Sequence, residues 1–225
     1  MNVEQRQGET LQYLVILPDD YDSTVGYPLV MLLHGFGASM RDLAGLAPAI
    51  SSTGYIYLCP NAPIPFDLGG GQQGFGWYTP RSDSMPEEIQ ESELLLEGFF
   101  EEAFEEFPQS TGALLMGFSQ GGGMTLRCGI GRPEAFAGLG ALSPALPEPN
   151  ELTSKLPDHR DQQIFVSHGH HDPLIALEDA RAINLYLEEA GYAPSYNEYV
   201  MGHEISAEVL SDLVAWMTDV LPPLR

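Results

Sequence analysis

The chain has 225 residues, enough for one α/β domain with a full hydrophobic core. Its 32 Asp and Glu residues against 9 Lys and Arg residues give a formal net charge of −23, which argues against nucleic acid and anionic membrane surfaces as partners. No apolar run is long enough to span a bilayer, so we expect no stable membrane insertion. Residues 1–6 lead into no apolar signal core, and Cys59 and Cys128 are predicted to be buried free thiols, so we expect a cytoplasmic location.

Seven apolar runs predict strands, and helical segments separate most of them. The runs lie near Leu11–Leu17, Leu29–Leu33, Tyr55–Cys59, Ala113–Met116, Gly138–Ser143, Gln163–Ser167 and Ser195–Val200. This alternation predicts an α/β fold with a mostly parallel central sheet and helices on both of its faces. No repeat or linker divides the chain and little length remains for a large cap, so we predict that residues 1–225 form a single domain.

A His-Gly turn follows the second of these strands, in the segment His34-Gly35-Phe36-Gly37. Enzymes that transfer acyl groups place a backbone donor for the developing oxyanion in such a turn. We therefore expect the backbone N–H of Phe36 to be one oxyanion donor and its ring to form a wall of the acyl pocket. A simple glycine turn is the alternative interpretation.

A long segment without regular structure is predicted at about Pro60–Pro86, which is rich in Gly and Pro and contains Trp77. Long loops in compact domains are often functional, so we expect this one over the active site with Trp77 as a wall of the substrate pocket. A surface loop anchored by an aromatic residue is the alternative.

A strongly acidic helix is predicted near Glu87–Phe107. Its apolar face carries Ile89, Leu96, Phe99, Phe100, Ala103 and Phe107, and its other face carries Glu91, Glu101, Glu102, Glu105 and Glu106. We interpret the acidic side as a solvated helix face. Adaptation to high salt, where screening relieves the self-repulsion of the chain, is the alternative.

The stretch Gly117-Phe118-Ser119-Gln120-Gly121 has the G-x-S-x-G pattern between a buried strand and a helix. This is the setting of a nucleophile elbow, in which glycines permit a sharp turn that lifts the Ser hydroxyl above the sheet. The helix N-terminus beside it offers free N–H groups, and we expect the backbone N–H of Gln120 to be the second oxyanion donor. The alternative is a tight glycine turn without chemistry.

Two further candidates follow Ser119 in the order Ser, Asp, His that α/β-hydrolases use. Asp172 lies in the turn after the strand at Gln163–Ser167, and His203 lies between the strand at Ser195–Val200 and the last predicted helix. Both positions are at carboxyl ends of strands, where open α/β sheets place their sites. The alternatives are a turn-forming Asp and a surface His. A metal site at His168, His170, His171 and Asp172 is a further, weaker alternative, because no second ligand motif completes it.

These motifs resemble the phospholipase/carboxylesterase family of α/β-hydrolases, which includes bacterial carboxylesterases and acyl-protein thioesterases. The resemblance runs from about Leu11 to the C-terminus and is carried by the segments Leu33–Gly37, Gly117–Gly122, His168–Ile175 and Gly202–Glu204. It implies an α/β-hydrolase fold without a large cap and a cytosolic hydrolase of esters or thioesters that uses no cofactor and no metal. It also implies that Ser119, Asp172 and His203 are the catalytic residues.

Phe36 departs from the family pattern, in which a Leu is frequent at this position. A bulkier side chain narrows the acyl pocket, for which we predict Phe36, Trp77 and Leu174 as lining residues. We therefore predict a carboxylesterase acting on small-molecule esters with short to medium acyl groups. Lysophospholipase, acyl-protein thioesterase and acyltransferase activities stay open, as do a non-catalytic binding protein on a hydrolase fold, a metal-dependent hydrolase and a homodimer.

Overall fold

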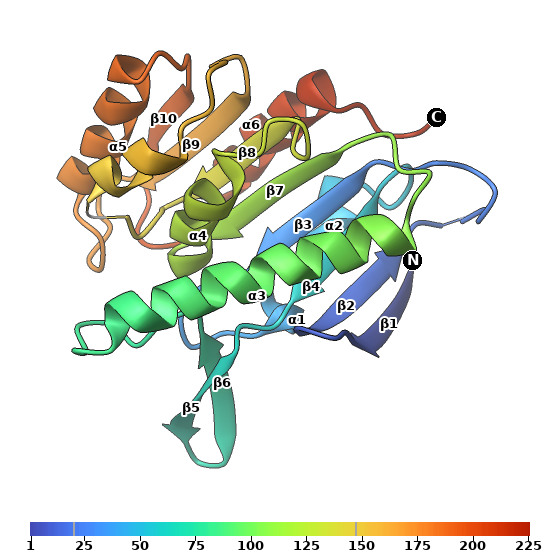
Figure 1. Cartoon of the computed structure of the whole chain (residues 1–225), viewed down its shortest axis with the longest axis horizontal. Coiled ribbons are helices and arrows are strands. Elements are labelled where there is room, and N and C mark those ends of the chain that lie inside the picture. The colour runs from blue at the N-terminus through green and yellow to red at the C-terminus, as the bar shows by residue number, and fades with distance from the viewer. Residues whose placement is uncertain (20, 147) are drawn as a thin grey trace.

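The central sheet has eight strands in the order β1-β2-β4-β3-β7-β8-β9-β10 (Figure 1). This computed structural model describes residues 1–19, 21–146 and 148–225. The strands of the sheet are β1 (Asn2–Gln7), β2 (Gln12–Leu17), β3 (Leu29–Leu33), β4 (Ile56–Pro60), β7 (Ala113–Phe118), β8 (Gly138–Leu142), β9 (Gln163–Gly169) and β10 (Ser195–Tyr199). Strand β2 pairs antiparallel with β1 and with β4, and every other pairing in the sheet is parallel. All seven predicted strands are present, and the prediction of a mostly parallel sheet is confirmed.

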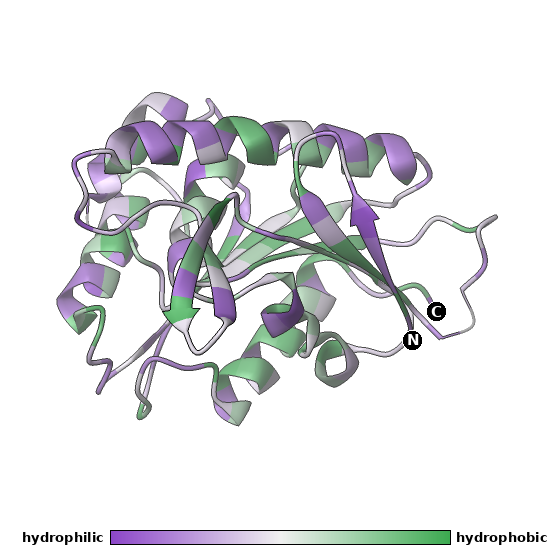
Figure 2. Cartoon of the chain, turned by 90° about the horizontal axis from the view of Figure 1, so that it is seen from below, coloured by the Kyte–Doolittle hydropathy of each residue, from purple (hydrophilic) through white to green (hydrophobic). Residues whose placement is uncertain are grey.

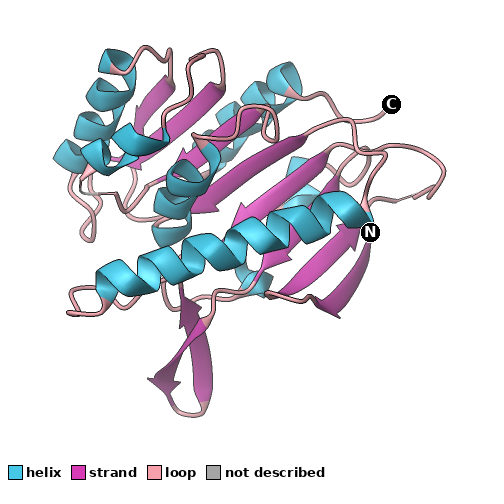
Figure 3. Ribbon diagram, viewed as in Figure 1, coloured by secondary structure: helices cyan, strands magenta, loops and turns pink. Residues whose placement is uncertain are grey.

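Helices cover both faces of the sheet (Figure 3). They are α1 (Met40–Ala44), α2 (Ala47–Ile50), α3 (Met85–Glu106), α4 (Gln120–Gly129), α5 (Leu177–Glu189) and α6 (Ala207–Val220), with a short 3-10 helix at Pro149–Lys155. Buried side chains of α3, α4 and α5 pack on one face, and those of α1, α2 and α6 pack on the other. Figure 2 shows the apolar strands between the two helical layers, whose helices carry both hydrophilic and hydrophobic residues. Within the described residues, no helix has the length and apolar character that crossing a membrane would require.

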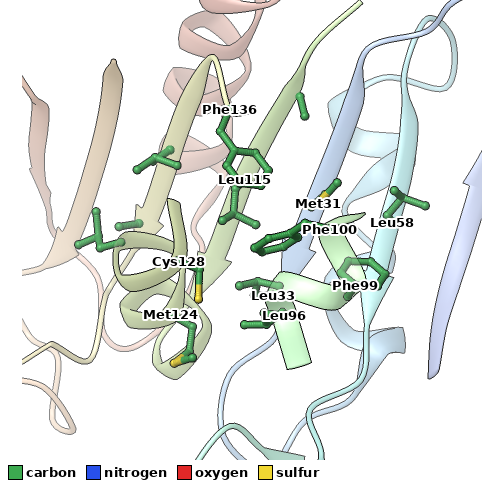
Figure 4. Close-up of a cluster of buried hydrophobic side chains, with 14 of the residues drawn as sticks. Met31, Leu33, Leu58, Leu96, Phe99, Phe100, Leu115, Met124, Cys128 and Phe136 are labelled. Atoms are coloured by element: carbon green, nitrogen blue, oxygen red, sulfur yellow. The ribbon is translucent and has the colours of Figure 1, made fainter. Parts of the chain in front are cut away.

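The larger core cluster lies between α3, α4 and the sheet (Figure 4). Phe99 and Phe100 of α3 are fully buried, and the Phe100 ring meets Phe136 edge-on with 5.0 Å between centroids. Met124 and Cys128 of α4 fill the neighbouring space, and both cysteines of the chain are buried free thiols, as predicted. This packing seats the N-terminal end of α4 directly above the carboxyl end of the sheet.

Two strand pairs involve segments that the apolar pattern does not predict. Strand β1 is a polar edge strand, and β5 (Ile64–Gly69) pairs antiparallel with β6 (Gln72–Gly76) in a hairpin inside the segment predicted to lack regular structure. The hairpin projects from the carboxyl end of the sheet (Figure 1). Backbone hydrogen bonds from Gly37 to Phe75 and from Phe75 to Ala38, each 2.8 Å, attach it to the turn after β3.

The acidic face of α3 is only partly a solvated face. Glu102 accepts hydrogen bonds from the backbone N–H groups of Glu9 and Thr10, and Glu106 forms an ion pair with Arg6 and accepts a hydrogen bond from the Tyr13 hydroxyl. These two glutamates therefore hold the β1–β2 hairpin against the helix. The interpretation as a purely solvated face is wrong for them, because the polar edge strand that they bind is absent from the apolar pattern.

Candidate active site

Ser119 occupies the sharp turn between β7 and α4. Its φ of +56° lies in the left-handed region, which is strained for a residue with a side chain and is characteristic of functional sites. The turn is held by a hydrogen bond from the Ser119 N–H to the Leu142 carbonyl at 2.9 Å, while the Ser119 carbonyl accepts from the N–H of Ala145 at 2.9 Å. The local geometry is that of the predicted nucleophile elbow.

The glycines around Ser119 are required by close backbone contacts. A Cβ atom on Gly117 would lie 2.2 Å from the Gly121 carbonyl oxygen, and one on Gly121 would lie 2.0 Å from the Leu33 carbonyl oxygen. Both distances are far below van der Waals contact, so any side chain here would push β7, α4 and β3 apart. The glycines thus let the helix start immediately beside two strand ends.

Asp172 and His203 are brought together from two different loops at the carboxyl end of the sheet. Asp172 follows β9 and His203 follows β10, and His203 Nδ1 lies 2.6 Å from Asp172 Oδ2. The other carboxylate oxygen, Oδ1, accepts hydrogen bonds from the backbone N–H groups of Leu174 at 2.9 Å and Ile175 at 3.0 Å. The Asp172 side chain is fully buried and that of His203 is 11% exposed. A buried carboxylate that is fixed in this way orients the imidazole.

The hydrogen bonds to Asp172 keep its carboxylate ionised. Burial by itself raises the pKa of Asp172, but the N–H of Ile175, the His203 ring and the N–H of Leu174 together outweigh that effect and lower the pKa below its ordinary value. The fully buried His168 also lies nearby, with its Nε2 3.0 Å from the Ile175 carbonyl oxygen and 3.4 Å from Asp172 Oδ2. His168 thus packs against the turn that presents Asp172.

The His203 ring lies against Phe118, the residue before Ser119, with 4.7 Å between ring centroids. The ring is therefore held beside the elbow. The Ser119 hydroxyl makes no hydrogen bond to His203 or to any other residue that the structure describes. In sites without substrate this contact is often long and shortens only when the reacting complex forms.

His34 fixes the orientation of the peptide between Gly35 and Phe36. Its Nε2 accepts from the N–H of Ala62 at 3.0 Å, so the proton of the neutral ring is on Nδ1, which donates to the Gly35 carbonyl at 2.7 Å. Because the peptide between Gly35 and Phe36 is trans, the N–H of Phe36 points away from His34. A Cβ atom on Gly35 would lie 3.3 Å from Ser119 Cβ, so this turn directly adjoins the nucleophile.

Gln120 has separate tasks for its backbone and its side chain. As the first residue of α4, it has a backbone N–H without an acceptor inside the helix, directed from the positive end of the helix dipole. Its buried side chain instead accepts from the N–H of Trp77 at 3.1 Å and donates to the Tyr78 carbonyl at 2.8 Å. The side chain thereby ties the segment after β6 to the nucleophile turn.

A cavity of about 510 Å³ opens beside Ser119. Its lining residues come from five segments of the chain: Phe36, Tyr78, Thr79, Pro80, Arg81, Ser119, Gln120, Ala145, Leu174 and Ile175. Phe36 and Leu174, both predicted from the sequence to line the acyl pocket, are among them and are 43% and 72% exposed. Phe36 also packs edge-on against Phe66 of the β5–β6 hairpin, with 4.6 Å between centroids.

Trp77 does not reach this cavity, and its predicted role as a pocket wall is wrong. Its side chain is fully buried in the core, where Nε1 donates to the His34 carbonyl at 2.9 Å. The neighbouring Tyr78 lines the cavity in its place. The Gln120 side chain bonds to the backbone of both residues and holds this bend with Trp77 toward the core and Tyr78 toward the cavity.

The histidine-rich turn after β9 does not gather its side chains around one point. His168 is buried against the Ile175 carbonyl, whereas His170 is 42% exposed with its Nε2 3.3 Å from Glu198. Among the residues that the structure describes, no group of three or more His, Cys, Asp or Glu side chains is arranged to hold a metal ion. The alternative of a metal site in this turn therefore has no geometric support.

A model of the phospholipase/carboxylesterase family matches residues 23–220. The chain belongs to the phospholipase/carboxylesterase family. The match includes the elbow, the turn after β3 and the loops of Asp172 and His203, so the resemblance stated from the motifs is confirmed.

Known members of the family and solved structures are similar to this chain over most of their length. Acyl-protein thioesterase 1 of Kluyveromyces lactis is 26% identical over 211 residues, which cover 86% of this chain and 92% of that protein. A probable carboxylesterase of Oryza sativa subsp. japonica is 27% identical over 209 residues, covering 85% and 77%. The carboxylesterase from Mesorhizobium loti has a TM-score of 0.77 at 18% identity, covering 97% of this chain and 99% of that one, which shows the α/β-hydrolase fold.

Several residues of this phospholipase/carboxylesterase site are not predicted from motifs. Tyr78, Arg81, Ala145 and Ile175 line the cavity, and the Gln120 side chain anchors one of its walls. The only sequence signal for the first two is their place in the long Gly- and Pro-rich segment, which does not show which side chains face inward.

Proposed function

We propose that this chain is a serine hydrolase that cleaves carboxylic esters with short to medium acyl groups through an acyl-Ser119 intermediate. The observation that carries the proposal is the buried, hydrogen-bonded pair of Asp172 and His203 beside a strained Ser119 at a helix N-terminus. Membership of the family and the relatives named as carboxylesterases support the same reaction class.

In the proposed acylation, the Ser119 oxygen attacks the ester carbonyl while His203 Nε2 takes the hydroxyl proton. Asp172 holds the proton of Nδ1 and stabilises the imidazolium that forms. The negative oxygen of the tetrahedral intermediate is held by the backbone N–H groups of Phe36 and Gln120. The imidazolium then protonates the departing alcohol, which leaves the acyl group on Ser119.

Deacylation repeats these steps with water as the nucleophile. His203 removes a proton from water, the hydroxide attacks the acyl carbonyl, and the returned proton restores the Ser119 hydroxyl as the carboxylic acid leaves. Both half-reactions need a neutral imidazole at their start.

Acyl thioesters are the second candidate substrates, because several relatives carry the name acyl-protein thioesterase. The cavity of about 510 Å³ has room for a short acyl chain beside Ser119, and Phe36 and Leu174 give it apolar walls. A thioester substrate would use the same residues, with a thiol as the leaving group.

The test is hydrolysis of p-nitrophenyl esters from acetate to palmitate, together with a butyryl thioester, by wild type and Ser119→Ala. Alanine at position 119 bears the same backbone strain as serine, so the fold is retained while the nucleophile is lost. We expect loss of turnover by on the order of 10⁴-fold or more, and loss of a single fluorophosphonate label read by intact mass.

Ser211→Ala, on the exposed side of α6, is the matched control and is expected to turn over and label like wild type. Full activity in Ser119→Ala would overturn the proposal. A label without turnover of any ester would show the nucleophile to be active and the substrate class to be wrong.

A further inference from the structure

Arg81 is a cation in the wall of the catalytic cavity. It is the one charged residue among those that line the cavity with Ser119, and it forms no hydrogen bond or ion pair with any residue that the structure describes. A cation without an acidic partner is unusual in this chain, because Asp and Glu outnumber Lys and Arg by 32 to 9. An arginine with a free guanidinium in the same cavity as Ser119 has five N–H donors available to a ligand.

Most of the other cationic side chains already form ion pairs with carboxylates. Those with an acidic partner are Arg6, Arg127, Arg132, Lys155 and Arg181. Arg127 and Lys155 line a neighbouring cavity of about 400 Å³ that shares Tyr78 and Ala145 with the catalytic one, but Glu93 and Glu151 neutralise them there. Arg81 is thus the cation that remains for a substrate at this site.

The backbone at Arg81 is held in a conformation that suits glycine. Pro80 and Arg81 are the two central residues of a turn closed by the Ser82 N–H on the Thr79 carbonyl at 3.4 Å, and Arg81 has a φ of +60°. In turns with Pro at the second position, a positive φ at the third is ordinarily occupied by Gly or Asn. The chain therefore keeps an arginine where the fold alone favours a residue without a large side chain.

The turn that presents Arg81 is tied to the first turn of α3. Glu88 accepts from the Thr79 N–H at 2.6 Å and from the Ser84 hydroxyl at 2.8 Å, and the Ser82 hydroxyl donates to the Thr79 carbonyl at 2.9 Å. These bonds hold both ends of the turn, which places Arg81 against the cavity without depending on substrate.

We propose that Arg81 is a specificity-determining residue that binds an anionic group, carboxylate or phosphate, carried by the ester substrate. A guanidinium matches either oxyanion with two parallel hydrogen bonds. Since the rest of the surface repels polyanions, the preferred substrates bear a single anionic group near the scissile bond. This inference rests on the proposed function, because it names the substrate class of the same cavity.

The test compares charged esters with neutral partners of the same shape. Monoethyl adipate and its amide place the carboxylate on the acyl side, whereas 3-butyryloxypropanoate and its amide place it on the alcohol side. Butyryl glycerol 3-phosphate against monobutyrin supplies the phosphate. We expect wild type to prefer the anion by about tenfold in kcat/KM in at least one pair, and Arg81→Gln to lose that preference through a higher KM.

Three further variants separate recognition from structure. Arg81→Lys is expected to keep part of the preference, since it keeps the charge but loses the planar fork. Arg81→Gly is expected to lose the preference while its melting temperature equals or exceeds that of wild type, because glycine tolerates the positive φ. Arg132→Gln makes the same change in net charge beyond the far end of α4 and is expected to keep the wild-type preference.

A wild-type enzyme that hydrolyses neutral esters but prefers no anionic partner would overturn the role of Arg81 and leave the proposed function standing. A preference that survives in Arg81→Gln would overturn it equally. If no ester is turned over, calorimetric binding of adipate decides: binding that Arg81→Gln weakens about tenfold supports the anion site although the esterase proposal fails, and equal binding or none overturns it.

Discussion

At the scale of single residues, His34 shows how a motif residue acts without touching substrate. Its two ring nitrogens connect the Ala62 N–H to the Gly35 carbonyl, and the second of these bonds sets the direction of the Phe36 N–H. Burial lowers the pKa of His34 to about 4, although the hydrogen bond to Gly35 opposes this shift. The neutral ring is the form that the bonding pattern requires, because a protonated Nε2 has no lone pair to accept from Ala62.

His34 is expected to make the stability of the fold depend on pH between about 6.5 and about 4. In this window an unfolded chain binds a proton at His34 and the folded chain does not, so stability that is present above pH 6.5 is lost as the pH falls. The shift corresponds to about 3 kcal/mol over the whole window. Urea unfolding at several pH values measures this slope.

The His34→Gln variant is expected to be less stable at pH 7 and to show a flatter slope over the same range, because it has no proton to gain. His159→Gln, which changes an exposed histidine, serves as the control and is expected to keep the wild-type slope. Parallel slopes in wild type and His34→Gln would contradict the assignment.

The residues of the predicted triad illustrate what motifs can predict, and Trp77 illustrates what they cannot. Ser119, Asp172 and His203 each follow an apolar strand, so the carboxyl edge of a parallel sheet brings their loops together. Whether Trp77 or Tyr78 faces the cavity depends on a register of one residue in a segment without an apolar pattern. That register is set by the Gln120 side chain, which binds the backbone of both residues.

At the scale of elements, the burial of a strand decides whether it can be predicted from the sequence. The central parallel strands are buried on both faces and therefore read as continuous apolar runs. Strand β1 is polar because it forms an edge, and the β5–β6 hairpin leaves most of its side chains exposed, so neither carries that signal. Both are held by partners far away in the sequence, namely the glutamates of α3 and the turn after β3.

The elbow has no room for an added methyl group, and Gly121→Ala is expected to destabilise the protein by about 3 kcal/mol or more. The added methyl group would meet the Leu33 carbonyl oxygen at 2.0 Å, and neither backbone can move without opening the sheet. Thermal unfolding and ester turnover are both expected to show the loss.

Gly202→Ala is the matched control, because a Cβ atom there has no neighbour nearer than the His171 carbonyl oxygen at 4.0 Å. Its stability is expected to stay within about 1 kcal/mol of wild type. Equal stability of the two variants would show that the backbone at the elbow has room that the structure does not show.

At the scale of the whole molecule, the net charge of −23 means that the acidic residues repel one another. The 9 Lys and Arg residues offset this repulsion only near their own positions. Exposed glutamates such as Glu101 and Glu105 lie one turn apart on α3, where like charges destabilise a helix. Added salt shortens the range of such repulsion from about 30 Å at 0.01 M to about 3 Å at 1 M.

The melting temperature is therefore expected to rise by several degrees between 0.01 M and 1 M NaCl, equivalent to about 1–2 kcal/mol. The double variant Glu101→Gln and Glu105→Gln is expected to melt higher than wild type at low salt and to gain less from added salt. A melting temperature that is constant or falls with salt would contradict both this expectation and the alternative that the acidic surface is an adaptation to high salt.

The backbone contacts around Ser119 also bear on how the enzyme acquires its reactivity during folding. The elbow touches the Leu33 carbonyl and is bonded to Ala145, so three segments distant in the chain must converge before the serine adopts its strained geometry. Helix α4 formed alone would carry the serine without the elbow, and non-local contacts of this kind form slowly. In a refolding experiment, the appearance of a covalent phosphonate adduct would thus time the closure of the sheet rather than the growth of its helices.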